Sequence, residues 1–284
     1  MPDKIYKNQH FLINPDIAKD MVFFAEVESK DHILEIGPGK GFLTKYLAEF
    51  AKKVTVIEKD SHLKDDLQEI KNKFSNIEIV MGNALSSKWP KGIDKIVSNI
   101  PFNITEPLFN RLYSERFKSA TLLVGEKQAN NIESYQERIL PDTTPISRLA
   151  ILTNAFFDTE YLMKIPSNSF NPEPSVNGAL ISIKPRKKST ARFEDYIFRS
   201  IWEQRKRPLG DSLTNSVINY LSIGGEICYL GKERILDLFN LPKELSGRRG
   251  TELVNPDFMR LYECLSNKKA KKKIFKTNRN LSNK

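Results

Sequence analysis

Short apolar runs alternate with amphipathic segments in the first part of the chain, whereas the second part carries amphipathic segments alone. Apolar runs of strand length lie at residues 32–36, 53–57, 77–81, 94–98 and 176–183. Apolar residues recur at helical spacing over residues 42–50, 193–202, 213–221, 232–239 and 255–265. Strands that alternate with helices are typical of a doubly wound α/β sheet. The pattern therefore predicts a doubly wound α/β domain followed by a smaller C-terminal helical domain.

The expected boundary between the two domains lies where the strand at 176–183 gives way to a basic linker. We expect the first domain to span residues 1–187, the helical domain to span residues 188–267, and a tail to span residues 268–284. A chain of 284 residues with 39% hydrophobic residues can bury a core in each domain.

The net charge of +10 is concentrated in the tail. Between residue 268 and the C-terminus there are eight basic residues and no acid, which leaves +2 for the rest of the chain. A segment of this composition is typical of a disordered arm that contacts nucleic-acid phosphates. A solubility tail and a localisation signal are the alternatives.

Three alternating glycines, Gly37, Gly39 and Gly41, follow the first strand and precede a helix. Glycine allows positive φ and a close approach of the backbone to a ligand, and the helix that follows points free N–H groups at it. Glu35, just before the turn, can hold an ammonium or an amide. Glu58 ends the second strand 21 residues after Gly37, where a carboxylate can accept both hydroxyls of a ribose. The spacing favours a nucleoside cofactor, and a tight turn with a solvated Glu58 is the alternative.

A second motif, Asn99-Ile100-Pro101-Phe102, follows the strand at 94–98. Asn99 is therefore expected at the carboxyl edge of the sheet, where open α/β sheets bind their ligands. Its side-chain oxygen and a backbone carbonyl freed by Pro101 can accept both N–H groups of an aromatic amine. The Phe102 ring can stack on a flipped base. Together with the glycine turn, the motif predicts methyl transfer to an amino group, and a turn with a core phenylalanine is the alternative.

Five motifs occur in the order and approximate spacing seen in the ribosomal RNA adenine dimethyltransferases, a family that this chain resembles from about residue 5 to 215. The motifs lie at residues 9–12, 35–41, 58, 99–102 and 170–176. The resemblance implies a Rossmann-like methyltransferase domain that uses S-adenosyl-L-methionine to dimethylate N6 of adenine in ribosomal RNA. The family divides into a branch for small-subunit ribosome biogenesis and an erythromycin-resistance branch that acts on the large subunit.

The resemblance also implies roles for single residues. The residues that it places around the cofactor are His10, Leu12, Gly37, Gly39, Glu58, Asn83 and Asn99. Asn99, Pro101 and Phe102 are expected to hold the target adenine, with Phe102 stacked on the base. The family usually has an aspartate where this chain has Asn83, and a neutral amide accepts a hydrogen bond more weakly than a carboxylate.

The segment at 203–213 is similar to a glutamine-arginine-lysine stretch of the small-subunit branch. Its Arg205, Lys206 and Arg207 are expected to line an RNA cleft, and plain solvation of a charged helix end is the alternative. Because the resistance branch lacks this stretch, the segment favours the small-subunit branch.

We therefore predict N6-dimethylation of two adjacent adenines near the 3′ end of small-subunit ribosomal RNA during ribosome biogenesis. One alternative is dimethylation of a large-subunit adenine, which gives macrolide-type resistance; Ile100 and Phe102 are closer to that branch. The other alternative is a relative that binds RNA without turnover, as an assembly or transcription factor. Asn83 and the altered segment at 126–132 favour this second alternative.

Cysteine and histidine usage argues against metal chemistry. Cys228 and Cys264 are too few and too scattered for a disulfide framework or a zinc site, and the three histidines are dispersed, so no metal is expected. Without a signal peptide or an 18-residue apolar run, we expect a cytoplasmic protein that does not contact membranes. The expected partner is ribosomal RNA in a small-subunit precursor particle, with a monomer as the default state.

Overall fold

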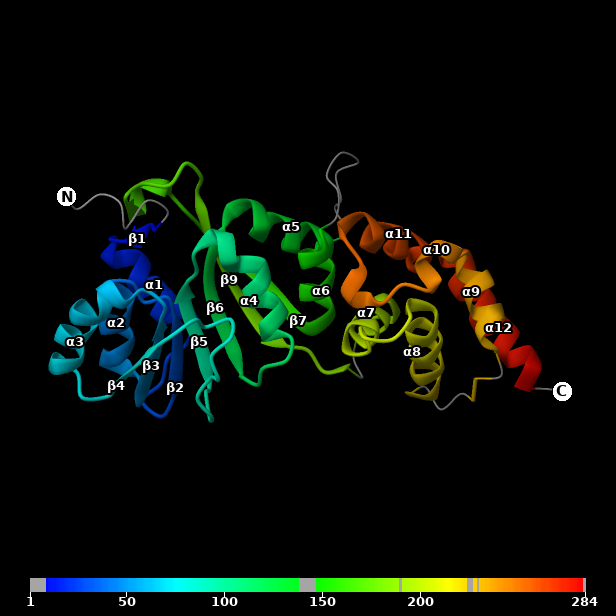
Figure 1. Cartoon of the computed structure of the whole chain (residues 1–284), viewed down its shortest axis with the longest axis horizontal. Coiled ribbons are helices and arrows are strands. Elements are labelled where there is room, and N and C mark those ends of the chain that lie inside the picture. Colours follow the sequence, from blue (N-terminus) through cyan, green and yellow to red (C-terminus); the bar gives the residue numbers. More distant parts are fainter. Residues whose placement is uncertain (1–8, 138–146, 189–190, 224–226, 229, 283–284) are drawn as a thin grey trace. The chain divides into compact units, whose positions relative to one another are not determined.

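The computed structural model describes residues 9–137, 147–188, 191–223, 227–228 and 230–282. The chain folds into two compact units, whose elements are labelled in Figure 1. The first unit comprises Met1–Glu133 and Phe157–Pro185, and the second comprises Ser134–Phe156 and Arg186–Lys284. The division after Pro185 lies close to the boundary expected at residue 187. Ser134–Phe156, which the sequence pattern assigns to the first domain, instead belongs to the second unit.

A seven-stranded mixed sheet forms the centre of the first unit, in the order β4-β3-β2-β5-β6-β9-β7. Its successive parallel strands are β2 (His32–Ile36), β3 (Lys53–Glu58), β4 (Ile77–Met81), β5 (Lys95–Asn99) and β6 (Ser119–Gly125). β9 (Gly178–Pro185) runs antiparallel to both β6 and β7 (Phe157–Ile165). The five strands expected from the apolar runs are present, with ends that agree within two residues. The predicted doubly wound α/β class is therefore confirmed.

The order of the strands reverses between β2 and β5. From β2 the chain runs outward to β3 and β4, and it then returns to the other side of β2 as β5. Open α/β sheets bind their ligands at such a reversal, beyond the carboxyl ends of the strands. The glycine turn follows β2 and Asn99 ends β5, so both predicted motifs reach the same edge of the sheet.

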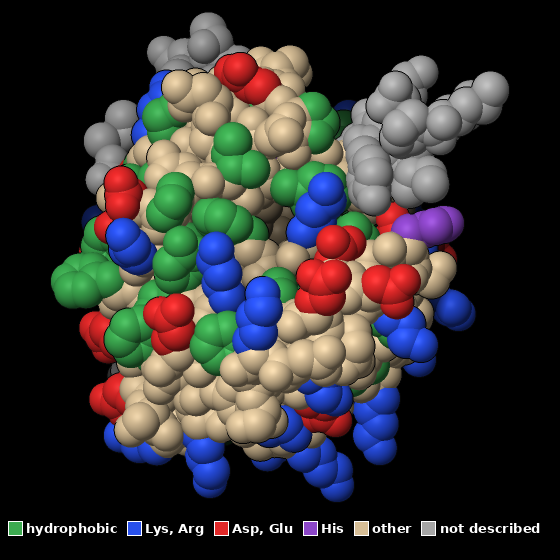
Figure 2. Space-filling model, turned by 90° about the vertical axis from the view of Figure 1, so that its left-hand side faces the viewer, with side chains coloured by type: hydrophobic (Ala, Val, Ile, Leu, Met, Phe, Trp, Pro, Cys, Tyr) green, Lys and Arg blue, Asp and Glu red, His purple; other side chains and the backbone are tan. Residues whose placement is uncertain are grey.

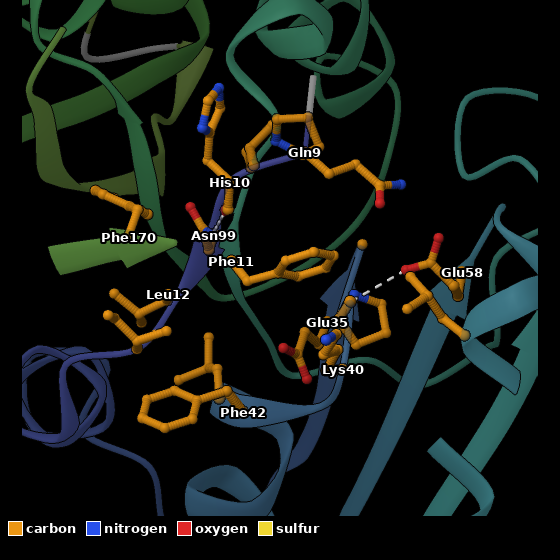
Figure 3. A pocket seen from close by; sticks show the side chains of 18 of the residues that line it. Gln9, His10, Phe11, Leu12, Glu35, Lys40, Phe42, Glu58, Asn99 and Phe170 are labelled. Carbon is orange, nitrogen blue, oxygen red and sulfur yellow. Dashed lines mark hydrogen bonds between the residues drawn. The ribbon is translucent and has the colours of Figure 1, made fainter. Parts of the chain in front are cut away.

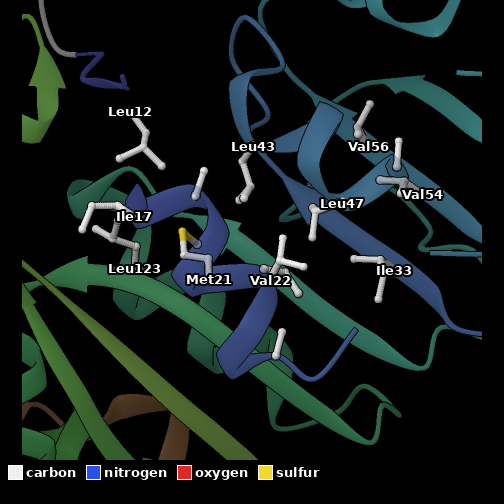
Figure 4. Close-up of a cluster of buried hydrophobic side chains, with 14 of the residues drawn as sticks. Leu12, Ile17, Met21, Val22, Ile33, Leu43, Leu47, Val54, Val56 and Leu123 are labelled. Atoms are coloured by element: carbon white, nitrogen blue, oxygen red, sulfur yellow. The ribbon is translucent and has the colours of Figure 1, made fainter. Parts of the chain in front are cut away.

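Helices of the first unit pack on this sheet, and one of them fixes the end of the glycine turn. Helix α1 (Pro15–Phe24) precedes β2, and the helices that follow are α2 (Phe42–Phe50), α3 (Lys64–Lys73), α4 (Thr105–Leu112) and α5 (Glu126–Glu137), of which α5 extends into the second unit. Met21 of α1 and Leu47 of α2 are fully buried in one cluster with Ile33 and Val54 of the sheet (Figure 4). Because burial of one such side chain contributes about 1.5–3 kcal/mol, this cluster holds α2 firmly behind the turn.

A second, two-stranded sheet joins segments that are far apart in the sequence. β1 (Phe11–Leu12) pairs antiparallel with β8 (Phe170–Asn171). His10 contacts the same segment, because its Nδ1 lies 2.8 Å from the Pro172 carbonyl oxygen. Strands of two residues carry no detectable period, so the sequence pattern does not predict this sheet. The pairing brings the N-terminal motif onto the motif at 170–176.

The second unit is helical and rich in aromatic rings. Its helices are α6 (Arg148–Phe156), α7 (Phe193–Glu203), α8 (Leu209–Ile223), α9 (Lys232–Phe239), α10 (Lys243–Ser246), α11 (Asn255–Ser266) and α12 (Lys268–Ser282). Phe193 stacks on Phe239 with ring centroids 6.0 Å apart, and Phe198 stacks on Phe258 at 6.4 Å. The four helices expected from apolar spacing correspond to α7, α8, α9 and α11.

The basic tail departs from the expectation of disorder. Lys268–Ser282 form helix α12, which packs against α9 and α11. Asn267 caps the first turn by accepting hydrogen bonds from the N–H groups of Lys269 (3.0 Å) and Ala270 (3.1 Å). Ala270 and Ile274, one turn apart, are buried. The cap and the apolar spacing therefore order a segment whose composition alone indicates a flexible arm.

Candidate cofactor and target site

A pocket in the first unit opens at the carboxyl ends of β2 and β5 (Figure 3). It is lined by residues 9–13, Glu35, residues 37–40, residues 42–43, Glu58, Leu63, residues 99–102 and Phe170. Two motifs that lie 62 residues apart in the sequence thus face one cavity.

The glycine turn has the backbone geometry that its motif predicts. Gly37, Gly39 and Gly41 have φ values of +67°, +60° and +74°, which glycine adopts without strain. A Cβ on Gly39 would lie 2.8 Å from the Phe11 ring, and a Cβ on Gly37 would lie 3.6 Å from Pro101 Cδ. The turn therefore runs directly against Phe11 and against the Asn-Ile-Pro-Phe loop.

Glu58 ends β3 with its carboxylate fixed at the pocket wall. Its Oε2 accepts a hydrogen bond from the Gly39 N–H (3.1 Å), and its Oε1 accepts one from the Asp60 N–H (2.8 Å). Only 6% of the residue is exposed, and this burial raises the pKa of Glu58, although the backbone hydrogen bonds oppose the shift. The carboxylate is thus positioned by the glycine turn itself.

Glu35 lies deeper, on β2, and is 1% exposed. The Thr44 hydroxyl donates a hydrogen bond to Glu35 Oε2 (2.6 Å). Burial raises the pKa of Glu35 to about 8; the Thr44 hydrogen bond opposes this shift, and the negative charge of Glu58 adds to it. Within the described residues, no cation pairs with either acid. Two buried carboxyl groups in one pocket suit a positively charged ligand.

Asn99 lies between the glycine turn and the N-terminal segment. Its Nδ2 donates to the His10 carbonyl oxygen (3.4 Å), while its Oδ1 accepts no hydrogen bond from any described residue. The buried Ser98 hydroxyl accepts the Ile36 N–H (2.6 Å), which ties the end of β5 to the end of β2. The side-chain oxygen of Asn99 is therefore available to an N–H group of a ligand in the pocket (Figure 3).

Phe102 continues the site with an aromatic surface. It begins the short 3₁₀ helix Phe102–Ile104, and the Thr105 hydroxyl donates to its carbonyl oxygen (3.1 Å). Its half-buried ring meets the buried Phe170 ring edge to face, with centroids 6.4 Å apart. Because β8 holds Phe170, the pairing of β1 with β8 also supports the Phe102 ring.

Sequence reasoning gives no role to three of the lining residues, Phe11, Lys40 and Phe170. Lys40 Nζ lies 5.4 Å from the centroid of the Phe11 ring, within cation–π distance. Phe11 borders the glycine turn, as described above, and Phe170 supports Phe102. All three lie inside the motifs that carry the family resemblance, so their place in a motif is the signal that could have found them.

The pocket brings together most of the residues predicted to contact cofactor or target, namely His10, Leu12, Gly37, Gly39, Glu58, Asn99, Pro101 and Phe102. Asn83 is not among the lining residues. It lies in the turn after β4, where its Oδ1 accepts the Leu85 N–H (3.0 Å). The side-chain oxygen of Asn83, which was expected to lie at the cofactor, therefore accepts a hydrogen bond from the backbone.

The predicted RNA-binding residues lie in the second unit, just after α7. The Arg205 guanidinium lies 5.1 Å from the Trp202 ring centroid and donates to the Trp202 carbonyl oxygen (3.1 Å). Arg205, Lys206 and Arg207 all line an open hollow. Lys206 and Arg207 are exposed, and Arg205 is half-buried. The structure therefore brings the three predicted residues to one hollow, with the Arg205 guanidinium also held by Trp202.

Two negative findings concern the described residues alone. Among them, no group of three or more His, Cys, Asp or Glu side chains is arranged to hold a metal ion. No helix in that part of the chain has the length and apolar character needed to cross a bilayer. Cys228 and Cys264 are both free thiols.

Comparisons with known proteins show the family of the chain. The sequence profile of the family described as "Ribosomal RNA adenine dimethylase" matches residues 4–242. A probable ribosomal RNA small subunit methyltransferase A of Methanococcus maripaludis is 34% identical over 213 residues, which cover 73% of this chain and 79% of the relative. The ribosomal RNA small subunit methyltransferase A of Clostridium botulinum is 31% identical over 277 residues, with 92% and 94% covered.

Solved structures include a similar protein, a dimethyladenosine transferase from Plasmodium falciparum. It superposes with a TM-score of 0.60 at 26% identity, over 89% of this chain and 96% of that one. These matches confirm the fold class, the predicted enzyme class, and S-adenosyl-L-methionine as the cofactor of the family. The chain belongs to the ribosomal RNA adenine dimethylase family.

Proposed function

We propose that the protein dimethylates N6 of two adjacent adenines near the 3′ end of small-subunit ribosomal RNA. The two relatives described above are named as small-subunit methyltransferases, and this chain covers 79% and 94% of their lengths. The observation that carries the proposal is the contact between the glycine turn and the Asn-Ile-Pro-Phe loop. This contact supports a site in which Asn99 meets both a nucleoside cofactor and the amine that receives the methyl group.

The pocket fits S-adenosyl-L-methionine. Burial raises the pKa values of Glu35 and Glu58, and a cationic ligand beside them would offset the penalty of charging them. We assign Glu58 to the ribose hydroxyls and the glycine turn to the amino-acid portion, with His10 and Leu12 at the border. The cofactor supplies a methyl group on a positively charged sulfur.

Asn99 and Phe102 are the residues that we assign to the target adenine. The exocyclic amine of adenine is a weak nucleophile because its lone pair is delocalised into the ring. Asn99 Oδ1 and a backbone carbonyl of the same loop can accept both N–H protons and favour a pyramidal nitrogen. Stacking of the base on Phe102 would contribute about 1–3 kcal/mol. The residues thus act by alignment, and no strong base is required.

The exposed cations of the second unit fit the RNA backbone. Lys206 and Arg207 are exposed beside an open hollow, and cations of this kind bind phosphate oxygens without reading sequence. We propose that they contact ribosomal RNA in a small-subunit precursor particle, in the cytoplasm, with the protein as a monomer.

A relative without turnover is the second candidate. The Asn83 oxygen accepts the Leu85 N–H, which favours weaker cofactor binding. The presence of Glu58 and Asn99 in one pocket argues against this candidate, because a protein that only binds RNA has no chemical need for both. Methylation of a large-subunit adenine would use the same chemistry on another target. The experiment below distinguishes the two targets.

The test is transfer of radiolabelled methyl from S-adenosyl-L-methionine to unmodified small and large ribosomal subunits in parallel. The labelled base is identified by nuclease digestion and chromatography. We expect dimethyladenosine in the small subunit alone. Label in large-subunit RNA would move the protein to the resistance branch, and absence of label together with absence of cofactor binding would favour the relative without turnover.

A further inference from the structure

Helix α12 presents a set of exposed lysines that the pocket does not use. The set, which we call the lysine face, consists of Lys268, Lys269, Lys272, Lys273 and Lys276. At ~100° per residue, the five positions span less than half of the helix circumference. They lie opposite the buried side chains of Ala270, Ile274 and Asn278.

Contacts on the buried side anchor α12 in the second unit. Ile274 is fully buried, and Asn278 Nδ2 donates to the Ile227 carbonyl oxygen (2.9 Å). Lys271, which lies outside the lysine face, forms an ion pair with the buried Glu194. These contacts hold the helix in place while the lysine face remains exposed.

The lysine face has no counter-charge of its own. The helix contains no Asp or Glu, and within the described residues none of the five lysines forms an ion pair. Lys268 and Lys272, Lys269 and Lys273, and Lys272 and Lys276 are each four residues apart, where like charges repel and weaken a helix. On the face of the molecule in Figure 2, by contrast, acidic side chains lie among the basic ones. A polyanion on α12 would relieve the repulsion.

We propose that the lysine face of α12 binds the phosphate backbone of RNA. Lysines one turn apart are ~5.4 Å apart along the helix axis, and their flexible ammonium groups act as point charges that suit phosphate oxygens. Such contacts hold RNA without reading its bases. The choice of RNA as the occupant rests on the proposed function. The surface itself is separate, because the family match ends at residue 242 and α12 lies beyond it.

An anionic membrane also attracts lysines, but it fits α12 less well. A helix that binds a membrane surface inserts an apolar side between the lipids. In α12 that side, with Ala270 and Ile274, is buried against the rest of the second unit. RNA needs no apolar side and therefore suits the helix as it is packed.

The test compares two full-length variants that each change five lysines to glutamine. The first is K268Q/K269Q/K272Q/K273Q/K276Q. The control is K52Q/K71Q/K73Q/K91Q/K184Q, whose lysines are exposed, lie in the first unit and form no ion pair within the described residues. Affinity for naked small-subunit ribosomal RNA is measured by filter binding, without methyl donor, at several salt concentrations.

We expect the lysine-face variant to bind RNA at least about tenfold more weakly in ~0.1 M salt. The slope of the logarithm of the binding constant against the logarithm of the salt concentration should become shallower by about 0.7 for each phosphate contact that is lost. The control should change less than about twofold. Replacement of the same five lysines by arginine should retain binding, because the charge is kept. Equal weakening in both glutamine variants, or weakening in neither, would overturn the proposal.

Folding and the membrane alternative are checked in the same series. Because glutamine removes like-charge repulsion, the thermal midpoint of the lysine-face variant should not fall. If it falls, the two-site variant K272Q/K276Q repeats the comparison. Tighter binding of the wild type to vesicles of anionic phospholipid than to RNA of equal phosphate concentration would overturn the proposal.

A wild type that binds RNA through α12 but transfers no methyl group would overturn the proposed function alone.

Discussion

Among single residues, Glu35 is the one through which pH acts most strongly on the pocket. Burial raises its pKa from 4.5 to about 8, so the folded state favours the protonated carboxyl. The stability that this proton contributes is fully present below about pH 4.5, and it is lost progressively as the pH rises through about 8. The pKa of Glu58 is raised for the same reason, burial, and its contribution has the same sign.

Replacing Glu35 by Gln keeps an acceptor for the Thr44 hydroxyl and removes the ionisation. The variant avoids the penalty of charging a buried acid. Its free energy of unfolding, relative to the wild type, should therefore rise by about 1–3 kcal/mol between about pH 6 and about pH 9. Urea unfolding at both pH values measures the difference. Glu49→Gln, at an exposed position on α2, is the control and should show no such rise. A pH dependence in Glu35→Gln equal to that of the wild type would contradict the raised pKa.

Asn99 is the residue that we assign to the chemical step. Asn99→Ala removes the oxygen that orients the amine, so methyl transfer in a single turnover should fall about 100-fold or more. RNA binding, measured by filter retention, should stay near that of the wild type. Asn103→Ala, an exposed position in the same loop, is the matched control. An equal fall in RNA affinity and in transfer would remove Asn99 from the chemical step.

Among the elements, the segment from β2 through the glycine turn to α2 defines the pocket floor. Its strand and helix are held by a buried cluster, while the turn between them has positive φ at all three glycines. The rigid flanks fix the place of the turn, and the missing Cβ atoms keep its backbone open to a ligand. Substitution in the turn should therefore affect ligand binding beyond its effect on stability.

Gly39→Ala and Gly92→Ala separate backbone strain from crowding. Both glycines have positive φ, +60° and +73°, so each variant should lose about 1 kcal/mol of stability. A Cβ on Gly39 would meet the Phe11 ring at 2.8 Å, whereas a Cβ on Gly92 has nothing within 4 Å. Only Gly39→Ala should lower the affinity for S-adenosyl-L-methionine, by about tenfold or more in calorimetric titration. If both variants bound the cofactor equally well, the turn would not be part of its site.

Local periodicity is sufficient to predict elements whose burial depends on residues that are near in the sequence. β2 and α2 begin and end where the apolar pattern does, because β2 is buried on both faces and one side of α2 faces the core. The pairing of β1 with β8 and the place of Ser134–Phe156 in the second unit depend on distant partners, and no local pattern contains them. The apolar pattern does not reveal α12, because its buried Ala270 and Ile274 are separated and flanked by lysines.

The residues of the candidate site also differ in whether their positions can be predicted from the sequence. Residues at strand ends, such as Glu58 and Asn99, can be placed from sequence because the topology carries strand ends to one edge. Asn83 differs, because a backbone N–H two residues further on competes for its oxygen, a local contact typical of asparagine in turns. Phe170 could not be linked to Phe102 from sequence, since their contact depends on the two-stranded sheet.

For the whole molecule, our assignments place the methyl-transfer chemistry in the first unit and the RNA affinity in the second. The pocket lies in the first unit, while Lys206, Arg207 and the lysine face lie in the second. Phosphate contacts dominate both the strength and the salt dependence of nucleic-acid binding, whereas the pocket decides which atom is modified. Substitutions of these cations in the second unit should therefore change the KM for ribosomal RNA.

The double variant K206Q/R207Q tests this division. Loss of two phosphate contacts should raise the KM for ribosomal RNA about tenfold and leave kcat and the Kd for S-adenosyl-L-methionine near their wild-type values. Steady-state methyl transfer and calorimetric titration give the three constants. R234Q/K243Q removes two other exposed cations of the same unit and should change none of them. A fall in kcat with unchanged KM would assign the pair to another role.

The pairing of Phe11 with Asn171 bears on the order in which the protein is synthesised. The N-terminal segment leaves the ribosome early, but its partner strand is not synthesised until 160 residues later. A nascent chain that has completed β2 to β6 already carries the glycine turn and Asn99, yet residues 9–13 have no strand to pair with. One wall of the pocket is missing until then. Cofactor retention during translation should therefore begin only when the first unit is almost complete.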